Sequence, residues 1–107
     1  MNVQFEDENL KELVETGKNK KYKKFAKVKP LMQGLAKVYK TLALISNVAD
    51  LGQFSYLKYE KMKNEYSGCS SVRIANGYVE RLIFTEHEGG ITIKLIKLDD
   101  SHYGNKK

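Results

Sequence analysis

The stretch that decides the fold runs from Gly68 to Tyr103 and reads GCSSVRIANGYVERLIFTEHEGGITIKLIKLDDSHY. It predicts three consecutive β-strands, because runs rich in β-branched and aromatic residues are separated by turn residues. The strands are expected at Cys69–Ala75, Tyr78–Thr85 and Gly90–Leu98. Both arginines and both histidines of the chain lie in this stretch. Since arginine grips a phosphate with two parallel donors, we expect this part of the sheet to present an anion-binding surface.

The hairpin around Asn76-Gly77 admits two registers, and they differ in where the arginines point. A two-residue turn would pair Val72 with Arg81 and put Arg73 on the other face of the sheet. A three-residue loop, with Gly77 in the left-handed region, moves the pairing by one residue. That register gathers the larger apolar side chains of both strands on one face and the two arginines on the other. We favour it, since two adjacent cations suit one phosphate.

Helices are expected before this block of strands. A short strand at Val3–Phe5 precedes a helix that starts in the acidic segment Glu6–Asn9 and ends near Gly17. A longer helix is predicted over Lys24–Ile45, where apolar residues recur every three or four positions. Pro30 lacks an amide hydrogen, so this helix either starts there or bends, and we expect a kink or a short preceding helix.

The first strand of the main sheet is predicted over Phe54–Met62, which carries three aromatic residues in loose alternation. The element order is then β-α-α-β-β-β-β. We therefore expect one α+β domain over residues 1–107, with two N-terminal helices packed on one face of a small, mainly antiparallel sheet of four to five strands.

The net charge of +6 is concentrated in one segment. Between Thr16 and Ala49 there is no acidic residue. Nine lysines occur there: Lys18, Lys20, Lys21, Lys23, Lys24, Lys27, Lys29, Lys37 and Lys40. Such a segment indicates a polyanionic or acidic protein partner, to which lysines alone would give affinity without reading sequence. The alternative is a solvated helix face that has no partner.

Composition also argues against several classes of function. No run of about 18 apolar residues is present, so neither a membrane-spanning helix nor a membrane partner is expected. The N-terminus lacks a secretory signal and Cys69 has no partner for an internal disulfide, which favours the cytoplasm. Two histidines and one cysteine do not make a spaced metal set, so no metal or other cofactor is predicted.

Four short segments carry a family resemblance. They are Tyr59–Lys63 (YEKMK), Ser67–Ile74 (SGCSSVRI), Glu80–Phe84 (ERLIF) and Asp99–Gly104 (DDSHYG). Together, in this order and spacing within a small basic chain, they resemble the RelE/HigB family of bacterial toxins from type II toxin–antitoxin pairs. The similarity extends over nearly the full chain and is densest from Tyr56 onward.

The resemblance implies a RelE-like fold and an endoribonuclease that cleaves mRNA, typically at the ribosome's decoding site, without a metal or another cofactor. In that reaction the substrate's own 2′-hydroxyl attacks the adjacent phosphate and leaves a cyclic phosphate and a free 5′-hydroxyl. The resemblance also implies a cognate antitoxin protein, expected to carry a helix-turn-helix DNA-binding domain, that blocks the activity. Translation inhibition and growth arrest would follow from the free toxin.

The family pattern assigns roles residue by residue. Arg73 and Arg81 would stabilise the charge that develops on the phosphorane. His102 would act as general acid or base, and Tyr103 would stack on a base or assist proton transfer. Glu60 stands where relatives place a second proton-transfer group, so it is a candidate base, with a lysine that contacts phosphate as the alternative. The expected RNA-binding lysines are Lys58, Lys61, Lys63 and Lys94.

Alternatives stay open for both site and function. Arg73 or Arg81 could bridge Glu80 or Glu86 across the sheet, and His102 could be an inert tail residue. In a second class of function the chain would be a ParE-like toxin directed at DNA gyrase. In a third it would be a non-catalytic RNA- or ribosome-binding module that uses the lysines. The two arginines and the C-terminal histidine favour the endoribonuclease.

Overall fold

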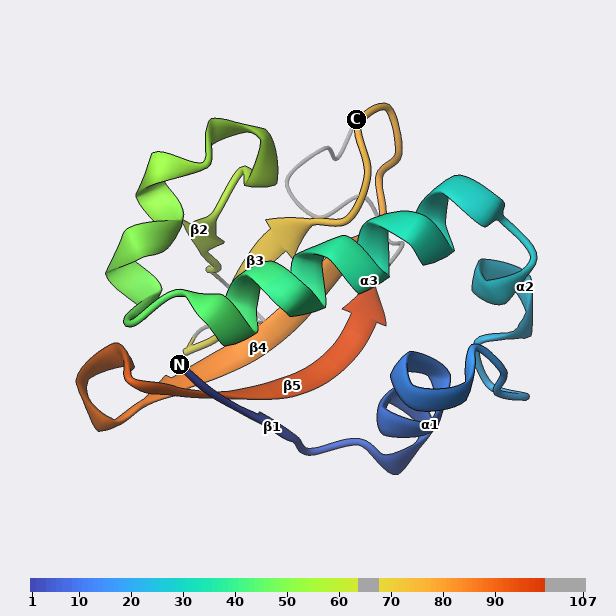
Figure 1. The fold of residues 1–107 in the computed structure, drawn as a ribbon, viewed down its shortest axis with the longest axis horizontal. Coiled ribbons are helices and arrows are strands. Elements are labelled where there is room, and N and C mark those ends of the chain that lie inside the picture. The colour runs from blue at the N-terminus through green and yellow to red at the C-terminus, as the bar shows by residue number, and fades with distance from the viewer. Residues whose placement is uncertain (64–67, 100–107) are drawn as a thin grey trace.

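The computed structural model describes residues 1–63 and 68–99 of the chain. In chain order the elements are β1 (Asn2–Phe5), α1 (Glu8–Thr16), α2 (Lys23–Ala26), α3 (Lys29–Leu44), η1 (Val48–Gln53), η2 (Ser55–Leu57), β2 (Glu60–Lys61), β3 (Ser70–Arg73), β4 (Arg81–His87), η4 (Glu88–Gly90) and β5 (Thr92–Asp99). The strands form one five-stranded sheet in the order β1-β5-β4-β3-β2 (Figure 1). Only β1 and β5 run parallel; the other pairs are antiparallel, so the predicted α+β class with a mainly antiparallel sheet is confirmed.

Local sequence sets the ends of the N-terminal helices. Asp7 caps α1 by accepting a hydrogen bond from the backbone N–H of Asn9 at 2.9 Å, and Gly17 ends the helix with a φ of 80°. The predicted long helix is in fact two helices, α2 and α3, with Pro30 in the first turn of α3. The expected short helix ahead of Pro30 is confirmed, because proline fits a first turn, where its missing N–H has no partner to lose.

The predicted strand over Phe54–Met62 is wrong for most of its length. A turn of 3₁₀ helix, η2, occupies its first part, and β2 keeps only two residues. The 3₁₀ conformation begins upstream, where Asn47 and Asp50 form a capping box at the start of η1. Apolar residues then recur at every third position, which is the 3₁₀ period and not the strand period. They are Val48, Leu51, Phe54 and Leu57.

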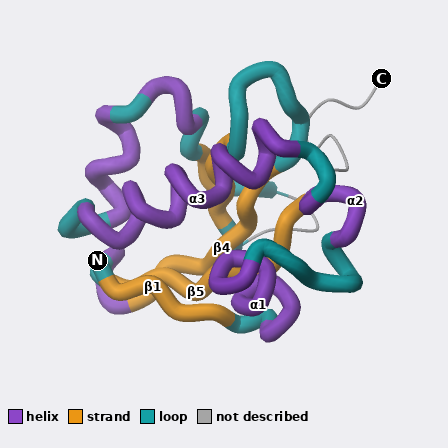
Figure 2. Tube along the Cα trace, turned by 45° about the vertical axis from the view of Figure 1, so that its right-hand side comes forward, coloured by secondary structure: helices purple, strands orange, loops and turns teal. Residues whose placement is uncertain are grey.

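One face of the sheet packs against the helices. α3 lies across this face, and α1 lies beside β1 and β5 (Figures 1 and 2). From α3 the core receives a buried stripe of Leu31, Leu35, Val38 and Leu42. From the sheet it receives Val72, Leu82, Phe84, Ile93, Leu95 and Leu98. Within the two described ranges, no helix is long and apolar enough to span a membrane.

α3 comes into close contact with the end of β3 at Gly34. A Cβ atom at this position would stand 2.3 Å from the backbone oxygen of Ile74 and 3.3 Å from the Cβ of Ala75. Glycine is therefore required here for the close approach of two backbones. The contact also closes one side of a cavity between α3 and the β3–β4 hairpin, which all three residues line.

Candidate functional site

The β3–β4 hairpin brings the two arginines together. Its register pairs Arg73 with Arg81 and Val72 with Leu82, and Gly77 in the turn has a φ of 87°. The three-residue-loop register predicted from the sequence is thus confirmed, although the regular strands stop earlier than expected, at the arginines. Directly paired residues share a face of a sheet. Both arginines therefore lie on the face opposite Leu82 and the helix-side core.

We call the sheet face turned away from the helix-side core the arginine face. The strand registers place two arginines, two lysines and two carboxylates on it: Arg73, Arg81, Lys94, Lys97, Glu60 and Asp99. Ser71 and Ile83 share this face and are fully buried. The charged groups therefore border a centre from which water is excluded, where electrostatic attraction to an anion is stronger than in water.

The guanidinium of Arg81 is held in a fixed position. Its Nε donates a hydrogen bond to the Ser71 hydroxyl at 2.8 Å, and one terminal nitrogen donates to the backbone carbonyl of Lys58, also at 2.8 Å. Lys58 ends η2 with a φ of 49°, an uncommon conformation for lysine, at the point where its carbonyl meets the arginine. A cation held from two directions is pre-organised, as a group that stabilises transition-state charge must be.

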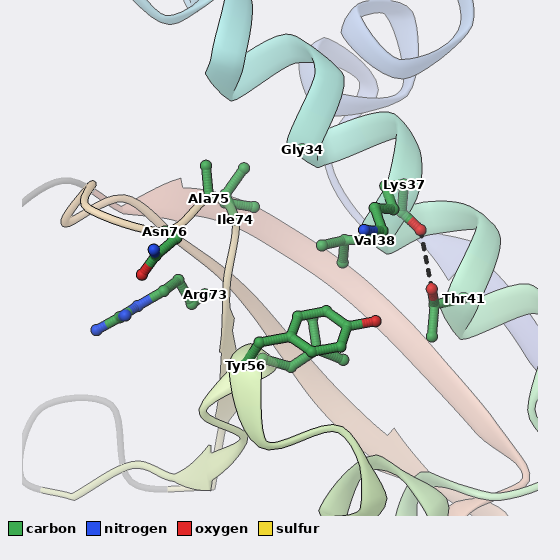
Figure 3. Close-up of a pocket in the computed structure, with 10 residues that line it drawn as sticks. Gly34, Lys37, Val38, Thr41, Tyr56, Arg73, Ile74, Ala75 and Asn76 are labelled. Atoms are coloured by element: carbon green, nitrogen blue, oxygen red, sulfur yellow. Dashed lines mark hydrogen bonds between the residues drawn. The ribbon is translucent and has the colours of Figure 1, made fainter.

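Arg73 is half-buried and, unlike Arg81, makes no hydrogen bond through its Nε to the described residues. The Nε itself is buried. Figure 3 shows the side chain extending past Asn76, with the guanidinium pointing away from the Tyr56 ring. A buried donor without a partner is costly, and an oxygen of a bound ligand would remove that cost.

The two glutamates that could have bridged the arginines do not do so. Glu86 lies on the helix side of the sheet, where it accepts hydrogen bonds from Tyr59 and Ser70. Glu80 has a buried carboxylate oxygen that is without a hydrogen-bond partner among the described residues. No ion pair joins either arginine to these carboxylates within residues 1–63 and 68–99. The bridging alternative is therefore wrong.

Three further candidates lie on or beside the arginine face. Glu60 is exposed and pairs with Ser71, whose hydroxyl accepts the hydrogen bond from Arg81. Lys94 is half-buried and lies further along the same face, on β5. Lys58 supplies its backbone carbonyl to Arg81 while its side chain is exposed. The structure thus places a carboxylate, two arginines and two lysine positions within one continuous region.

Of the other candidates, the two lysines at β2 do not join that group. Lys61 lies on the opposite side of the sheet, with its ammonium 3.6 Å from a carboxylate oxygen of Glu86. Consecutive residues of a strand point to opposite faces, and Glu60, directly before Lys61, lies on the arginine face. Lys63 is exposed beyond the end of β2. His102 and Tyr103 lie outside the described residues.

A hydrogen-bonded cluster on the helix side of the sheet was missed by sequence reasoning. The Glu86 carboxylate accepts hydrogen bonds from the hydroxyls of Tyr59 and Ser70, both at 2.5 Å, and attracts the Lys61 ammonium. The Tyr59 ring also stacks on Phe84, with ring centroids 6.4 Å apart. These contacts fasten the segment before β2 to β4. The one signal in the sequence was spacing, since Glu86 follows Phe84 by two positions and so shares its face.

Two groups of this cluster, the Glu86 carboxyl and the Tyr59 phenol, have shifted pKa values. Burial alone would raise the pKa of Glu86, but the hydrogen bonds from Ser70 and Tyr59 and the charge of Lys61 outweigh it and hold the pKa below its usual 4.5. Burial, with the neighbouring carboxylate, raises the pKa of Tyr59 to about 12. The carboxylate therefore stays ionised and the phenol stays protonated on both sides of neutral pH.

Replacing Glu86 by glutamine should remove an acid-dependent part of the stability. A carboxylate with a lower pKa in the folded than in the unfolded state contributes stability that is complete above pH 4.5 and is lost as the pH falls through the folded value. Denaturant titrations at a series of pH values should show the free energy of unfolding falling more steeply below pH 4.5 for the wild type than for Glu86→Gln. Glu15→Gln, on the exposed side of α1, should follow the wild type. Equal slopes for the wild type and Glu86→Gln would show that the cluster does not hold the carboxylate charged.

The nine lysines between Thr16 and Ala49 are all exposed, and we call them the lysine surface. They belong to the helices and their connections, and none lies on a strand. The Lys21 ammonium is 3.5 Å from a carboxylate oxygen of Asp7, and that of Lys37 lies 5.4 Å from the centroid of the Tyr56 ring. The lysine surface is thus a second cationic region, distinct from the arginine face.

The described residues offer no metal site. Among residues 1–63 and 68–99, no three histidine, cysteine, aspartate or glutamate side chains gather where they could hold an ion. The arginine face itself places fixed cations beside a carboxylate, and such groups can bind a phosphate and act on a nearby hydroxyl proton. Compared with known proteins, the chain matches no model of a protein family, and no curated protein sequence matches it either.

Proposed function

We propose that this protein is the toxin of a type II toxin–antitoxin pair, a RelE/HigB-like endoribonuclease that cleaves mRNA on the ribosome in the cytoplasm. The observation that carries the proposal is the cross-strand pair of Arg73 and Arg81 on one face, with Arg81 fixed by Ser71 and the Lys58 carbonyl. The general α+β architecture is compatible with a RelE-like fold, which is part of the proposal. The resemblance of the four sequence segments supplies the reaction class.

The proposed reaction needs no cofactor. The 2′-hydroxyl of one nucleotide forms a bond to the adjacent phosphorus, and its proton passes to a base, for which Glu60 is the candidate on the arginine face. Arg73 and Arg81 stabilise the negative charge of the phosphorane. The bond from phosphorus to the 5′-oxygen then breaks, and His102, with Tyr103 nearby in sequence, protonates that oxygen. A 2′,3′-cyclic phosphate and a free 5′-hydroxyl result.

RNA binding in this proposal combines the two cationic regions. On the arginine face and beside it, Lys94 and Lys58 would contact the backbone near the cleaved bond. Lys61 and Lys63 would contact the strand further away, at the edge of the sheet where β2 lies. The lysine surface would contact ribosomal RNA or an acidic part of the antitoxin. The antitoxin, a protein with a helix-turn-helix domain, is expected to be encoded beside this gene.

Mapping the 5′ ends of cellular transcripts after brief expression tests the proposal. New ends inside translated reading frames, each with a 5′-hydroxyl, are the expected result. Intact transcripts together with damaged DNA would overturn it in favour of a ParE-like gyrase inhibitor. The lysine surface favours one other candidate, a non-catalytic RNA- or ribosome-binding module. Sedimentation of the protein with ribosomes while transcripts stay intact and DNA is undamaged would overturn the proposal in favour of that module.

A further inference from the structure

A cavity of about 240 Å³ lies between α3, η2 and the β3–β4 hairpin (Figure 3). Its apolar floor consists of core residues, each at most 4% exposed: Val38 from α3, Leu57 from η2 and Ile74, which directly follows β3. The volume falls below the range of about 300–1,000 Å³ typical of drug-sized ligands. The cavity can therefore hold one small group, and its volume is too small for a helix or an extended peptide.

Among the described residues, the polar groups that line the cavity are cationic or neutral. They belong to Lys37, Arg73, Thr41 and Asn76, and no carboxylate from residues 1–63 or 68–99 joins them. The side-chain hydroxyl of Thr41 donates to the Lys37 carbonyl at 3.0 Å, so its oxygen can still accept a hydrogen bond from a ligand. The Lys37 ammonium, with no acid among the described lining residues, favours an anionic ligand.

Tyr56 gives the cavity its aromatic wall. The residue is 52% exposed, although it is one of the larger apolar residues of the protein, and its ring lies between the Arg73 end and the Thr41 end of the cavity (Figure 3). The Lys37 ammonium lies 5.4 Å from the ring centroid. An exposed ring beside a cation is suited to a planar ring that carries a negative group, since it stacks while the cation pairs with the charge.

Arg73 connects this cavity to the arginine face. It is one of the residues that line the cavity and it pairs with Arg81 in the sheet register, while its guanidinium points away from the Tyr56 ring (Figure 3). A ligand that extends out of the cavity toward the arginine face would therefore pass along Arg73. The chemistry that fits is a nucleotide, with its base against Tyr56 and its phosphate near Arg73 and Lys37.

We propose that this cavity is a nucleotide subsite that holds one unpaired base of an RNA strand. Its place in the RNA substrate rests on the proposed function, whereas its affinity for a nucleotide does not. The base stacks on Tyr56 above the apolar floor, and Thr41 and Asn76 offer hydrogen bonds to its edge. The following phosphate lies toward Arg73 and leads the strand onto the arginine face. The subsite gives the protein a preference for the base next to the cleaved bond.

Titration of the full-length chain with the four ribonucleoside 5′-monophosphates, followed by calorimetry, tests the subsite. At least one nucleotide should bind roughly tenfold more tightly than ribose 5-phosphate, because stacking of a base on an aromatic ring contributes about that much or more. Tyr56→Ala should remove this difference, and Tyr56→Phe, which keeps the ring, should retain it. Lys37→Ala should weaken the binding of nucleotides and of ribose 5-phosphate to the same extent, because both carry the phosphate. Lys11→Ala, an exposed lysine of α1 outside both the cavity and the lysine surface, is the control and should leave binding unchanged.

Three results would overturn the subsite. They are equal affinity for nucleotides and ribose 5-phosphate, unchanged nucleotide binding by Tyr56→Ala, and tighter binding of a short acidic peptide with an aromatic residue than of any nucleotide. The outcome is separable from that of the proposed function. Intact transcripts in cells, with nucleotide binding that depends on Tyr56, would overturn the endoribonuclease and leave the subsite standing. Cleaved transcripts, with nucleotide binding that is unchanged in Tyr56→Ala, would overturn the subsite and support the endoribonuclease.

Discussion

Arg81→Ala is expected to lower the rate of mRNA cleavage by roughly 100-fold or more, because removing one pre-organised group that stabilises transition-state charge has that effect in other enzymes. The same change removes the hydrogen bonds to Ser71 and to the Lys58 carbonyl, so the free energy of unfolding should also fall, by about 1–2 kcal/mol. Cleavage of a defined mRNA on purified ribosomes measures the first effect, and denaturant titration measures the second.

Comparison with other variants separates these two effects. Arg73→Ala should also lower the cleavage rate but leave stability close to the wild type, because the Nε of Arg73 has no hydrogen bond to lose within the described residues. Arg81→Lys keeps the charge and loses the planar fork of donors, so its rate should lie between those of the alanine variant and the wild type. Lys11→Ala, a cation on the exposed side of α1, should change neither quantity. A cleavage rate of Arg81→Ala equal to that of the wild type would show that the arginine pair does not take part in the reaction.

Gly34→Ala is expected to destabilise the protein by about 1–3 kcal/mol, the usual cost of forcing an extra group into a packed site. Two effects of opposite sign compete here. In a helix interior, alanine is better than glycine by about 1 kcal/mol. The added Cβ, however, would stand 2.3 Å from the Ile74 carbonyl oxygen, a backbone atom that cannot rotate away. We expect the clash to win, since α3 or the hairpin must move to relieve it.

Gly52→Ala is the matched control for this prediction. Gly52 lies in η1, and an added Cβ there would meet nothing within 4 Å. Its φ is not in the left-handed region, so alanine should be neutral or stabilise by about 0.4–1 kcal/mol through the unfolded chain. Thermal or denaturant unfolding of both variants measures the difference. A Gly34→Ala variant as stable as Gly52→Ala would show that α3 moves away from the hairpin at little cost.

The strand block was largely predictable because its signals are local. Alternation of apolar residues and the Asn76-Gly77 turn placed β3, β4 and β5, and the size of the apolar side chains indicated the register that the structure adopts. The segment over Phe54–Met62 was not predictable in the same way, because aromatic residues in loose alternation can also fit a 3₁₀ period. A capping box upstream decided the matter.

The candidate site was predictable only in its cations. Two arginines on adjacent strands could be assigned to one face from the register alone. The two groups that hold Arg81, the Ser71 hydroxyl and the Lys58 carbonyl, could not be predicted. The carbonyl belongs to the residue that ends η2, in a segment for which the sequence predicts a strand. The family resemblance predicts Lys61 as one of the RNA-binding lysines. In the structure it pairs with Glu86 on the other side of the sheet.

The sequence by itself determined the strands from Gly68 onward, the hairpin register and the concentration of lysine between Thr16 and Ala49. These features depend on residue type and on the two-residue period of a strand, which neighbouring residues set among themselves. Only the tertiary structure decided that Gly34 meets Ile74, that Lys37 and Tyr56 line one cavity with Arg73, and that Glu86 collects Tyr59, Ser70 and Lys61. The physical reason is that these groups come from elements far apart in the chain, and only the packing of α3 and η2 against the sheet sets the distances between them.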